Sequence, residues 1–241
     1  MRNSITIAAT ALVSVLASSP VRALQYVQDR QTIDELVEEF ERAGLSRQLE
    51  LGKNIVRLHD KQLLARLEDR LTDKDRHVRA NMAFVFAGLS DPRGFEVIAG
   101  ILNDRSDRPQ GQGLPGGRWS VAQQIRADRY YAVHVLAELE DERSVDLLLP
   151  LLPDADVNYK VAWALGEIGN ARAITPLIKA LRDDDALVRV SAIHALVKLR
   201  AKEALPHLRA LLNDHAMPSA GDQVSVADTA NTAITELQKE P

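Results

Sequence analysis

A block of twelve residues with one apolar spacing recurs five times along the chain. The copies occupy residues 78–89, 128–139, 157–168, 188–199 and 226–237. In each copy apolar residues stand at positions five, nine and twelve, and steps of four and then three place them on one face of a helix. Self-similarity of this kind is the signature of a repeat architecture, so we expect the core to consist of stacked copies of one helical unit.

A second helical segment follows each of the first four blocks after only a few residues. Asp91 and Asp141 stand where these segments need an N-cap, and Pro92 takes a first helical position, where its missing N–H costs nothing. Because the connections are so short, each pair of helices must form an antiparallel hairpin. The last Leu of successive pairs recurs about every 30 residues, as such repeats require, except for one longer gap that marks an insertion.

These patterns predict an all-α chain that forms a right-handed α-solenoid of about five HEAT-like helix pairs, with a terminal helix at each end. A helix of about 12 residues is marginal by itself, so each pair is expected to gain stability by burying its apolar face on the next pair. We expect residues 24–46 to form an N-terminal capping helix, which a Thr32…Glu35 capping box opens, and residues 47–241 to form the solenoid.

One stretch of sequence carries a resemblance to a known family. The string VNYKVAWALGEIGNARAITPLIKALRDDDALVRVSAIHAL, residues 157–196, resembles the short HEAT-like repeats of the phycobilisome-lyase type found in bacteria. The resemblance extends over about residues 47–237. It implies a scaffold rather than one activity, since such repeats occur in lyase subunits, in scaffolds and in proteins with other roles.

The first 23 residues differ from the repeats. Arg2 precedes an uncharged run from Ser4 to Pro20, and Val21-Arg22-Ala23 places small residues at −3 and −1 of a candidate cleavage point. This layout predicts a secretory signal peptide, residues 1–23, cleaved after Ala23, and a periplasmic or secreted protein whose membrane contact is transient. The alternatives are an uncleaved anchor or an ordinary helix, although the apolar run is short for a membrane span.

The composition argues against several kinds of chemistry. The chain has no Cys, which removes disulfides, thiolate metal sites and Cys nucleophiles. A net charge of −4 argues against a nucleic-acid partner. None of the six His residues is followed by Glu, and the chain has neither a Walker loop nor a nucleophile elbow. We therefore expect no catalytic residue, no cofactor and no metal, and a non-catalytic scaffold of the bacterial envelope that binds another protein.

Two loops interrupt the repeat, residues 103–124 and 215–224. Each joins the second helix of one pair to the first helix of the next, so both should leave the same edge of the solenoid, where insertions often mark a binding side. The alternative is drift, because long insertions in surface loops cost little stability. The first loop and the helix after it combine arginines with aromatic residues, as protein interfaces do.

A second candidate surface is the outward column of the first helices, at positions three and seven of the blocks. The alternative is that neighbouring repeats bury part of this column. The predicted partner-binding residues from both surfaces are Arg118, Trp119, Arg126, Arg129, Tyr130, Tyr159 and Trp163. For the loop, the alternative is that Trp119 folds back on it while the arginines pair with Asp residues.

An Asp recurs two residues after the end of each helix pair. We expect this Asp ladder to cap helices or to pair with Arg79, Arg129 and Arg189, rather than to bind Ca²⁺. Its members are Asp73, Asp104, Asp154, Asp183 and Asp214.

Two other functions stay open. The resemblance implies, as the first alternative, a bilin lyase-like or chaperone-like HEAT-repeat subunit, which would work with a second subunit on a cytoplasmic, pigment-bearing target. A signal peptide does not agree with that location. The second alternative is a structural spacer in an envelope assembly.

Overall fold

The computed structural model describes residues 35–106, 120–220 and 224–239, so the predicted signal peptide and the candidate residues Arg118 and Trp119 lie outside the described residues. The chain divides after Asp60 into two units, which we describe separately. The solenoid's predicted start at residue 47 is not settled by this division and stays a prediction.

In the first unit, residues 35–42 are helical and are followed by α3 (Leu45–Arg57). Val37, Phe40 and Ile55 are buried, and the buried Gln48 side chain donates a hydrogen bond of 3.2 Å to the Phe40 carbonyl. This side-chain bond and the apolar residues together hold the two helical segments against each other.

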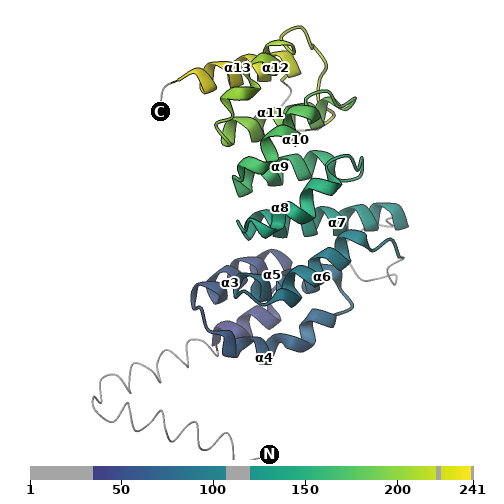
Figure 1. The fold of residues 1–241 in the computed structure, drawn as a ribbon. Coiled ribbons are helices and arrows are strands. Elements are labelled where there is room, and N and C mark those ends of the chain that lie inside the picture. Colours follow the sequence, from purple (N-terminus) through teal and green to yellow (C-terminus); the bar gives the residue numbers. More distant parts are fainter. Residues whose placement is uncertain (1–34, 107–119, 221–223, 240–241) are drawn as a thin grey trace, which may run out of the picture. The chain divides into compact units, whose positions relative to one another are not determined.

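The second unit consists of helix pairs that follow one another in sequence order (Figure 1). It begins with η1 (Lys61–Leu63), α4 (Leu64–Leu67) and η2 (Glu68–Thr72). The first helices of the pairs are α5 (Arg76–Gly88), α7 (Val121–Glu138), α9 (Asn158–Ile168), α11 (Ala186–Lys198) and the terminal α13 (Val226–Gln238). The second helices are α6 (Pro92–Asn103), α8 (Arg143–Leu148) with η3 (Leu149–Leu151), η4 (Ala171–Ala173) with α10 (Ile174–Ala180), and η5 (Lys202–Ala204) with α12 (Leu205–Arg209).

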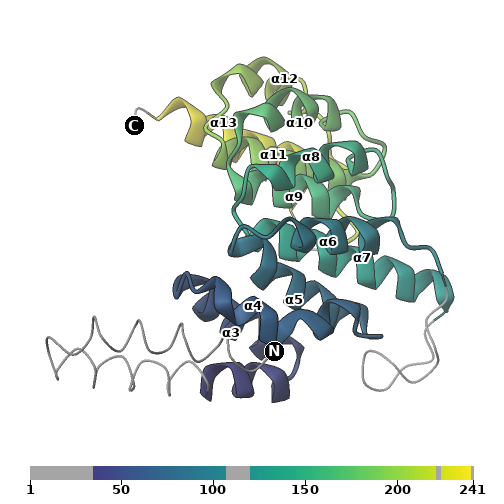
Figure 2. The same cartoon turned by 60° about the horizontal axis from the view of Figure 1, so that its bottom comes forward.

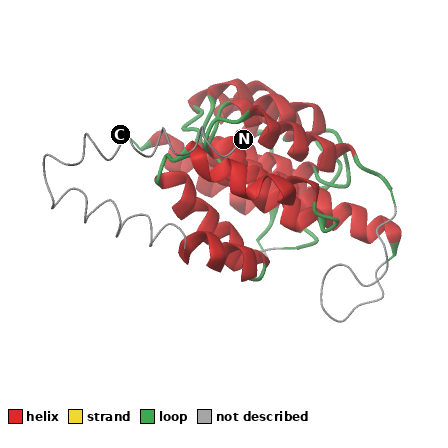
Figure 3. Cartoon of the chain, turned by 90° about the horizontal axis from the view of Figure 1, so that it is seen from below, coloured by secondary structure: helices red, strands yellow, loops and turns green. Residues whose placement is uncertain are grey.

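The helices of this unit form two layers. Each first helix contacts the next one, from α5 through α7, α9 and α11 to α13, while α6, α8, α10 and α12 lie in the other layer (Figure 2). The described residues contain helices and loops and no strand (Figure 3). The predicted α-solenoid is confirmed, while its handedness stays a prediction.

The apolar positions of the repeat form the core. Positions five and nine are buried in all five blocks, for example Met82 and Phe86 in α5 and Val161 and Leu165 in α9. Close packing of neighbouring first helices also depends on a missing side chain: a Cβ on Gly166 of α9 would lie 2.7 Å from the Cα atom of Ala195 in α11. The repeat therefore sets both the buried faces and the spacing of the helices.

The backbone turns in the same way after the first helices. After α5, α7, α9 and α11 the residue that follows the closing Leu or Ile has a positive φ: Ser90, Glu140, Gly169 and Arg200. His59, which follows Leu58 at the end of α3, has one too. This left-handed conformation is the usual way to end a helix, and it strains every residue except Gly.

The Asp ladder is structural, as predicted. All five of its carboxylates accept a hydrogen bond from the backbone N–H two residues later, at 2.8–3.1 Å, which fixes the turns between pairs. Arg129 and Arg189 pair with the carboxylates of Asp154 and Asp214, whereas Arg79 donates to the backbone carbonyl of Asp73.

None of the helices within the described residues is long and apolar enough to cross a bilayer.

Candidate functional site

Aromatic side chains from two neighbouring first helices gather on the outward face of the second unit. We name this group the α7–α9 cluster; its members are Tyr130, Tyr131 and His134 of α7 and Tyr159, Lys160 and Trp163 of α9. Tyr130 and Tyr159 have ring centroids 5.9 Å apart, and those of His134 and Trp163 are 5.7 Å apart. These spacings are typical of interacting aromatic pairs. The expected outward column is thus a group of half-buried side chains in α7 and α9, whereas in α5 the same two positions, Ala80 and Phe84, are buried, as the alternative had it.

The helical period explains why these residues meet. Tyr130 and Tyr159 occupy position three of their blocks, while His134 and Trp163 occupy position seven. Positions five and nine face the core, so positions three and seven lie on the other side of each helix. Because α7 and α9 pack side by side, the two columns contact each other.

Lys160 lies between two aromatic faces. Its Nζ atom is 3.2 Å from the ring centroid of Trp163 and 4.9 Å from that of Tyr130, a cation–π arrangement. Burial disfavours the charged ammonium and lowers the pKa of Lys160 to about 8, although Glu138 and Glu167 act in the opposite direction. Near neutral pH this lysine is therefore easier to deprotonate than a solvated one.

Sequence reasoning did not select Lys160. The available signal was its position one residue after Tyr159 and three before Trp163, because residues three apart are neighbours on a helix surface.

Tyr131 anchors the cluster to the preceding pair. Its hydroxyl donates a hydrogen bond of 2.6 Å to Oδ1 of Asn81 in α5, and its ring meets His77 edge to face with centroids 4.7 Å apart. Burial raises the pKa of Tyr131 to about 12, so it stays a neutral donor. The cluster thus has a fixed inner side and an outer side formed by half-buried rings.

The predicted site residues separate into groups. Tyr130, Tyr159 and Trp163 come together in the α7–α9 cluster, and Arg126 is exposed and donates a hydrogen bond of 3.1 Å to Asp156. Arg129 is different: its side chain is 0% exposed, and Nε donates to the Leu102 carbonyl at 2.9 Å. Arg129 therefore belongs to the core and is not available on the surface where we expected it.

Hydrogen bonds hold the residues at which the first inserted loop begins. The buried Arg76 donates hydrogen bonds to Asp104, to Asp128 and to the Ser106 hydroxyl at 2.6–2.9 Å. Burial alone would raise the pKa of Asp104, but the hydrogen bonds from Ser106 and Arg76 hold it at about 2. At the other end, Ser120 and Gln123 form a capping box at the start of α7, so α7 begins three residues before the predicted end of the loop.

Comparison with protein-family models matches residues 124–185 and 148–218 to HEAT repeats. Among curated proteins, "Phycocyanobilin lyase subunit alpha" of Picosynechococcus sp. is 40% identical over 95 residues, and its namesake in Synechococcus elongatus is 35% identical over 96 residues. Each match covers 35% of this chain and 35% of the relative, so the chain spans about a third of the length of the curated relatives it matches.

Among solved structures, the complex of CpcE and CpcF of phycocyanin lyase from Nostoc sp. matches with a TM-score of 0.48 and 21% identity, over 73% of this chain and 65% of that chain. An engineered protein matches with a TM-score of 0.44 and 18% identity, over 86% and 96% of the two chains.

The curated relatives confirm HEAT-like repeats of the lyase type but contradict two of our expectations. We expected a non-catalytic envelope scaffold and no enzyme, whereas both curated relatives are named as subunits of a lyase. The expectation was wrong because it rested on the absence of short catalytic motifs, and neither that absence nor the fold decides function.

Proposed function

We propose that this chain is a lyase-type HEAT-repeat subunit that takes part in joining a bilin to a protein, or in removing it, together with a second protein. The observation that carries the proposal is the 40% identity over 95 residues to a phycocyanobilin lyase subunit alpha. The repeats alone would support only a scaffold, because the same architecture serves many functions.

The α7–α9 cluster supports the proposal by offering a surface for a protein partner. Tyr, Trp and Arg are the residues that most often dominate binding energy at protein interfaces. Tyr159 and Trp163 are half-buried, and Arg126 is exposed one turn before Tyr130. We assign this surface to contact with the bilin-accepting protein or with a second subunit.

Lys160 supports a chemical role for the same surface. An amine with a pKa of about 8 exchanges protons readily near neutral pH, and such groups are suited to general acid–base steps. The ammonium is held on the ring of Trp163, so its place is fixed relative to the aromatic surface.

A bilin-transfer assay tests the function. The full chain is mixed with chromophore-bearing phycocyanin, or with phycocyanobilin and the apoprotein, each with and without CpcF, and the bilin absorbance is followed. We expect a change in absorbance and pigment transfer that depends on this chain. If neither mixture gives absorbance change or transfer, the proposed function is overturned.

Two variants test the surface. Tyr159→Ala with Trp163→Ala should weaken partner binding at least tenfold, since truncating a Tyr or Trp that dominates an interface costs about 2 kcal/mol or more. The melting temperature should fall only slightly, because each ring loses one aromatic contact to α7. Phe95→Ala is the matched control, because Phe95 is a half-buried aromatic of α6 with Arg143 over its ring. A large loss of stability in the double variant would assign the two rings to packing instead.

The predicted export stays a separate proposal. N-terminal sequencing of the protein from its native cells, with Leu24 as the first residue, would support cleavage of residues 1–23. An intact Met1 would overturn it.

A further inference from the structure

A cavity of about 670 Å³ lies between α11 and α13, the last two first helices. Its walls are largely apolar: Leu187, Val190 and Val197 come from α11, Ala233 from α13, and Pro218 and Val224 from the segment before α13. The volume is in the range that holds a small organic ligand.

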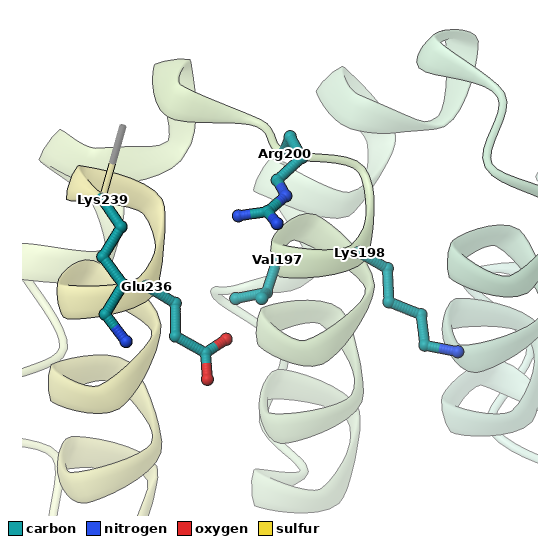
Figure 4. Close-up of a pocket in the computed structure, with 5 residues that line it drawn as sticks. All are labelled: Val197, Lys198, Arg200, Glu236 and Lys239. Carbon is teal, nitrogen blue, oxygen red and sulfur yellow. The ribbon is translucent and has the colours of Figure 1, made fainter. Parts of the chain in front are cut away.

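A second cavity of about 470 Å³ continues from the first at the C-terminal end of the two helices. The two cavities share Val197, Lys198 and Glu236, so they form one groove, which we name the α11–α13 groove. At this end the lining changes from apolar to charged, with Arg200 and Lys239 joining Glu236 (Figure 4).

The cations at this end differ in their partners. Lys198 points away from α13 (Figure 4) and pairs with Glu167 of α9. Within the part of the chain that the structure describes, neither Arg200 nor Lys239 forms an ion pair. Figure 4 shows the Arg200 guanidinium and the Glu236 carboxylate in the space between the two helices. The groove end therefore has two cations against one carboxylate.

This combination selects a kind of ligand. An apolar channel favours an elongated apolar body, and a guanidinium favours a carboxylate because the two groups form parallel, charge-assisted hydrogen bonds. A ligand with an apolar framework and carboxylates on short side chains would satisfy both parts of the groove at once. A purely apolar ligand would leave Arg200 and Lys239 without an anionic partner, and a small anion would leave the apolar part of the groove empty.

We propose that the α11–α13 groove binds an elongated apolar molecule whose carboxylate reaches Arg200 and Lys239. Resting on the proposed function, the ligand is a linear tetrapyrrole with propionate side chains. The groove then holds the pigment, while the α7–α9 cluster, two helices along the same layer, contacts the protein.

Biliverdin, a linear tetrapyrrole with two propionates, is the probe, and its dimethyl ester is the matched probe without free carboxylates. Absorbance titration of the full chain should give tighter binding of the acid than of the ester. Arg200→Gly with Lys239→Ala should weaken binding of the acid about tenfold and leave binding of the ester unchanged. Gly suits the positive φ of 52° at position 200, so this change is compatible with the fold.

A control and a second variant keep the test decisive. Lys179→Ala with Arg182→Ala removes the same charge from exposed positions outside the groove, and binding of both probes should not change. Val190→Trp fills the apolar part, so it should weaken both probes. The groove assignment would be overturned if the native chain bound the acid and the ester equally well. It would also be overturned if both Val190→Trp and the variant Arg200→Gly with Lys239→Ala bound the acid with native affinity.

The outcomes separate the two proposals. If the native chain transfers bilin but both groove variants bind biliverdin as the native chain does, the groove assignment is wrong and the proposed function is supported. If the groove variants lose the carboxylate-dependent binding but the native chain transfers no bilin, the proposed function is wrong and the groove assignment is supported.

Discussion

The fully buried guanidinium of Arg129 donates a hydrogen bond of 2.5 Å to the carboxylate of Asp154 and, through Nε, one of 2.9 Å to the carbonyl of Leu102. Arg129 lies in α7, Leu102 ends the preceding pair, and Asp154 lies in the turn that leads into the next first helix. One side chain therefore joins three successive pairs, and the loss of either contact should weaken the stacking of the two pairs that it joins.

Asp154→Ala should destabilise the protein by about 2 kcal/mol, because it removes the 2.5 Å partner of a buried cation and leaves only the Asp156 carboxylate, at 3.6 Å. Asp146→Ala is the control: Asp146 and its partner Arg172 are 62% and 56% exposed, so this pair should contribute less than about 1 kcal/mol. Urea unfolding of both variants measures the difference. Equal losses of stability would show that the buried Arg129–Asp154 ion pair contributes no more than the exposed Arg172–Asp146 pair.

Acid should destabilise the protein between about pH 4 and pH 2. The Arg129 hydrogen bond lowers the pKa of Asp154, and the contacts of Asp104 hold its pKa at about 2, below the value of about 3.9 in unfolded chains. For a lowered pKa, the stabilisation is complete above the unfolded value and is lost as pH falls through the folded value. Thermal melts from pH 5 to pH 2 test this. Asp104→Asn should show a weaker dependence on pH than the native protein.

Glu140→Gly should stabilise the protein by about 0.5–1 kcal/mol. Glu140 has a φ of 50°, where a side chain costs about 1–2 kcal/mol, and part of that gain is offset by the extra freedom of Gly in the unfolded chain. Glu142→Gly makes the same change of charge at an exposed residue with a φ of −57°, so it should not stabilise. Chemical denaturation compares the two, and stabilisation by both would point to charge rather than to backbone strain.

Lys160→Met should remove a rise in stability that the native protein shows between about pH 8 and pH 10.5. In this window the unfolded chain binds the Lys160 proton and the folded chain does not, because the folded pKa is about 8. The free energy of unfolding therefore rises with pH in this window. Since Tyr131 and Tyr159 are common to both proteins, the difference in unfolding free energy across this range isolates the lysine. Parallel curves would contradict a lowered pKa at position 160.

The sequence predicted the helix pairs because apolar spacing alone decides which face of a helix is buried. It did not predict the shape of three of the second helices: α8, α10 and α12 are short α-helices, each joined to a short 3₁₀ turn. Pro150, Pro176 and Pro206 lie within or at the start of these segments, and a residue without an N–H interrupts regular helical hydrogen bonding.

The site was harder to predict than the fold. Position three or seven of a block identifies an outward residue, so Tyr130, Tyr159 and Trp163 could be found. The Asp ladder led us to expect an ion pair for Arg129, at position two. Nothing in one sequence tells that this pair is buried, or that the partner is Asp154, 25 residues further along the chain. The α11–α13 groove depends on the distance between two helices and on the segment before α13, neither of which apolar spacing determines.

The Arg129 contact also limits how such a chain could grow by copying its own units. A duplication of residues 121–152 would carry a buried cation into the new copy and leave its anion behind, in the turn that follows. A copied unit that runs on through Asp154 carries both charges. For this repeat, a unit that keeps the ion pair therefore ends within the turn, after Asp154, and not at the end of the helix pair.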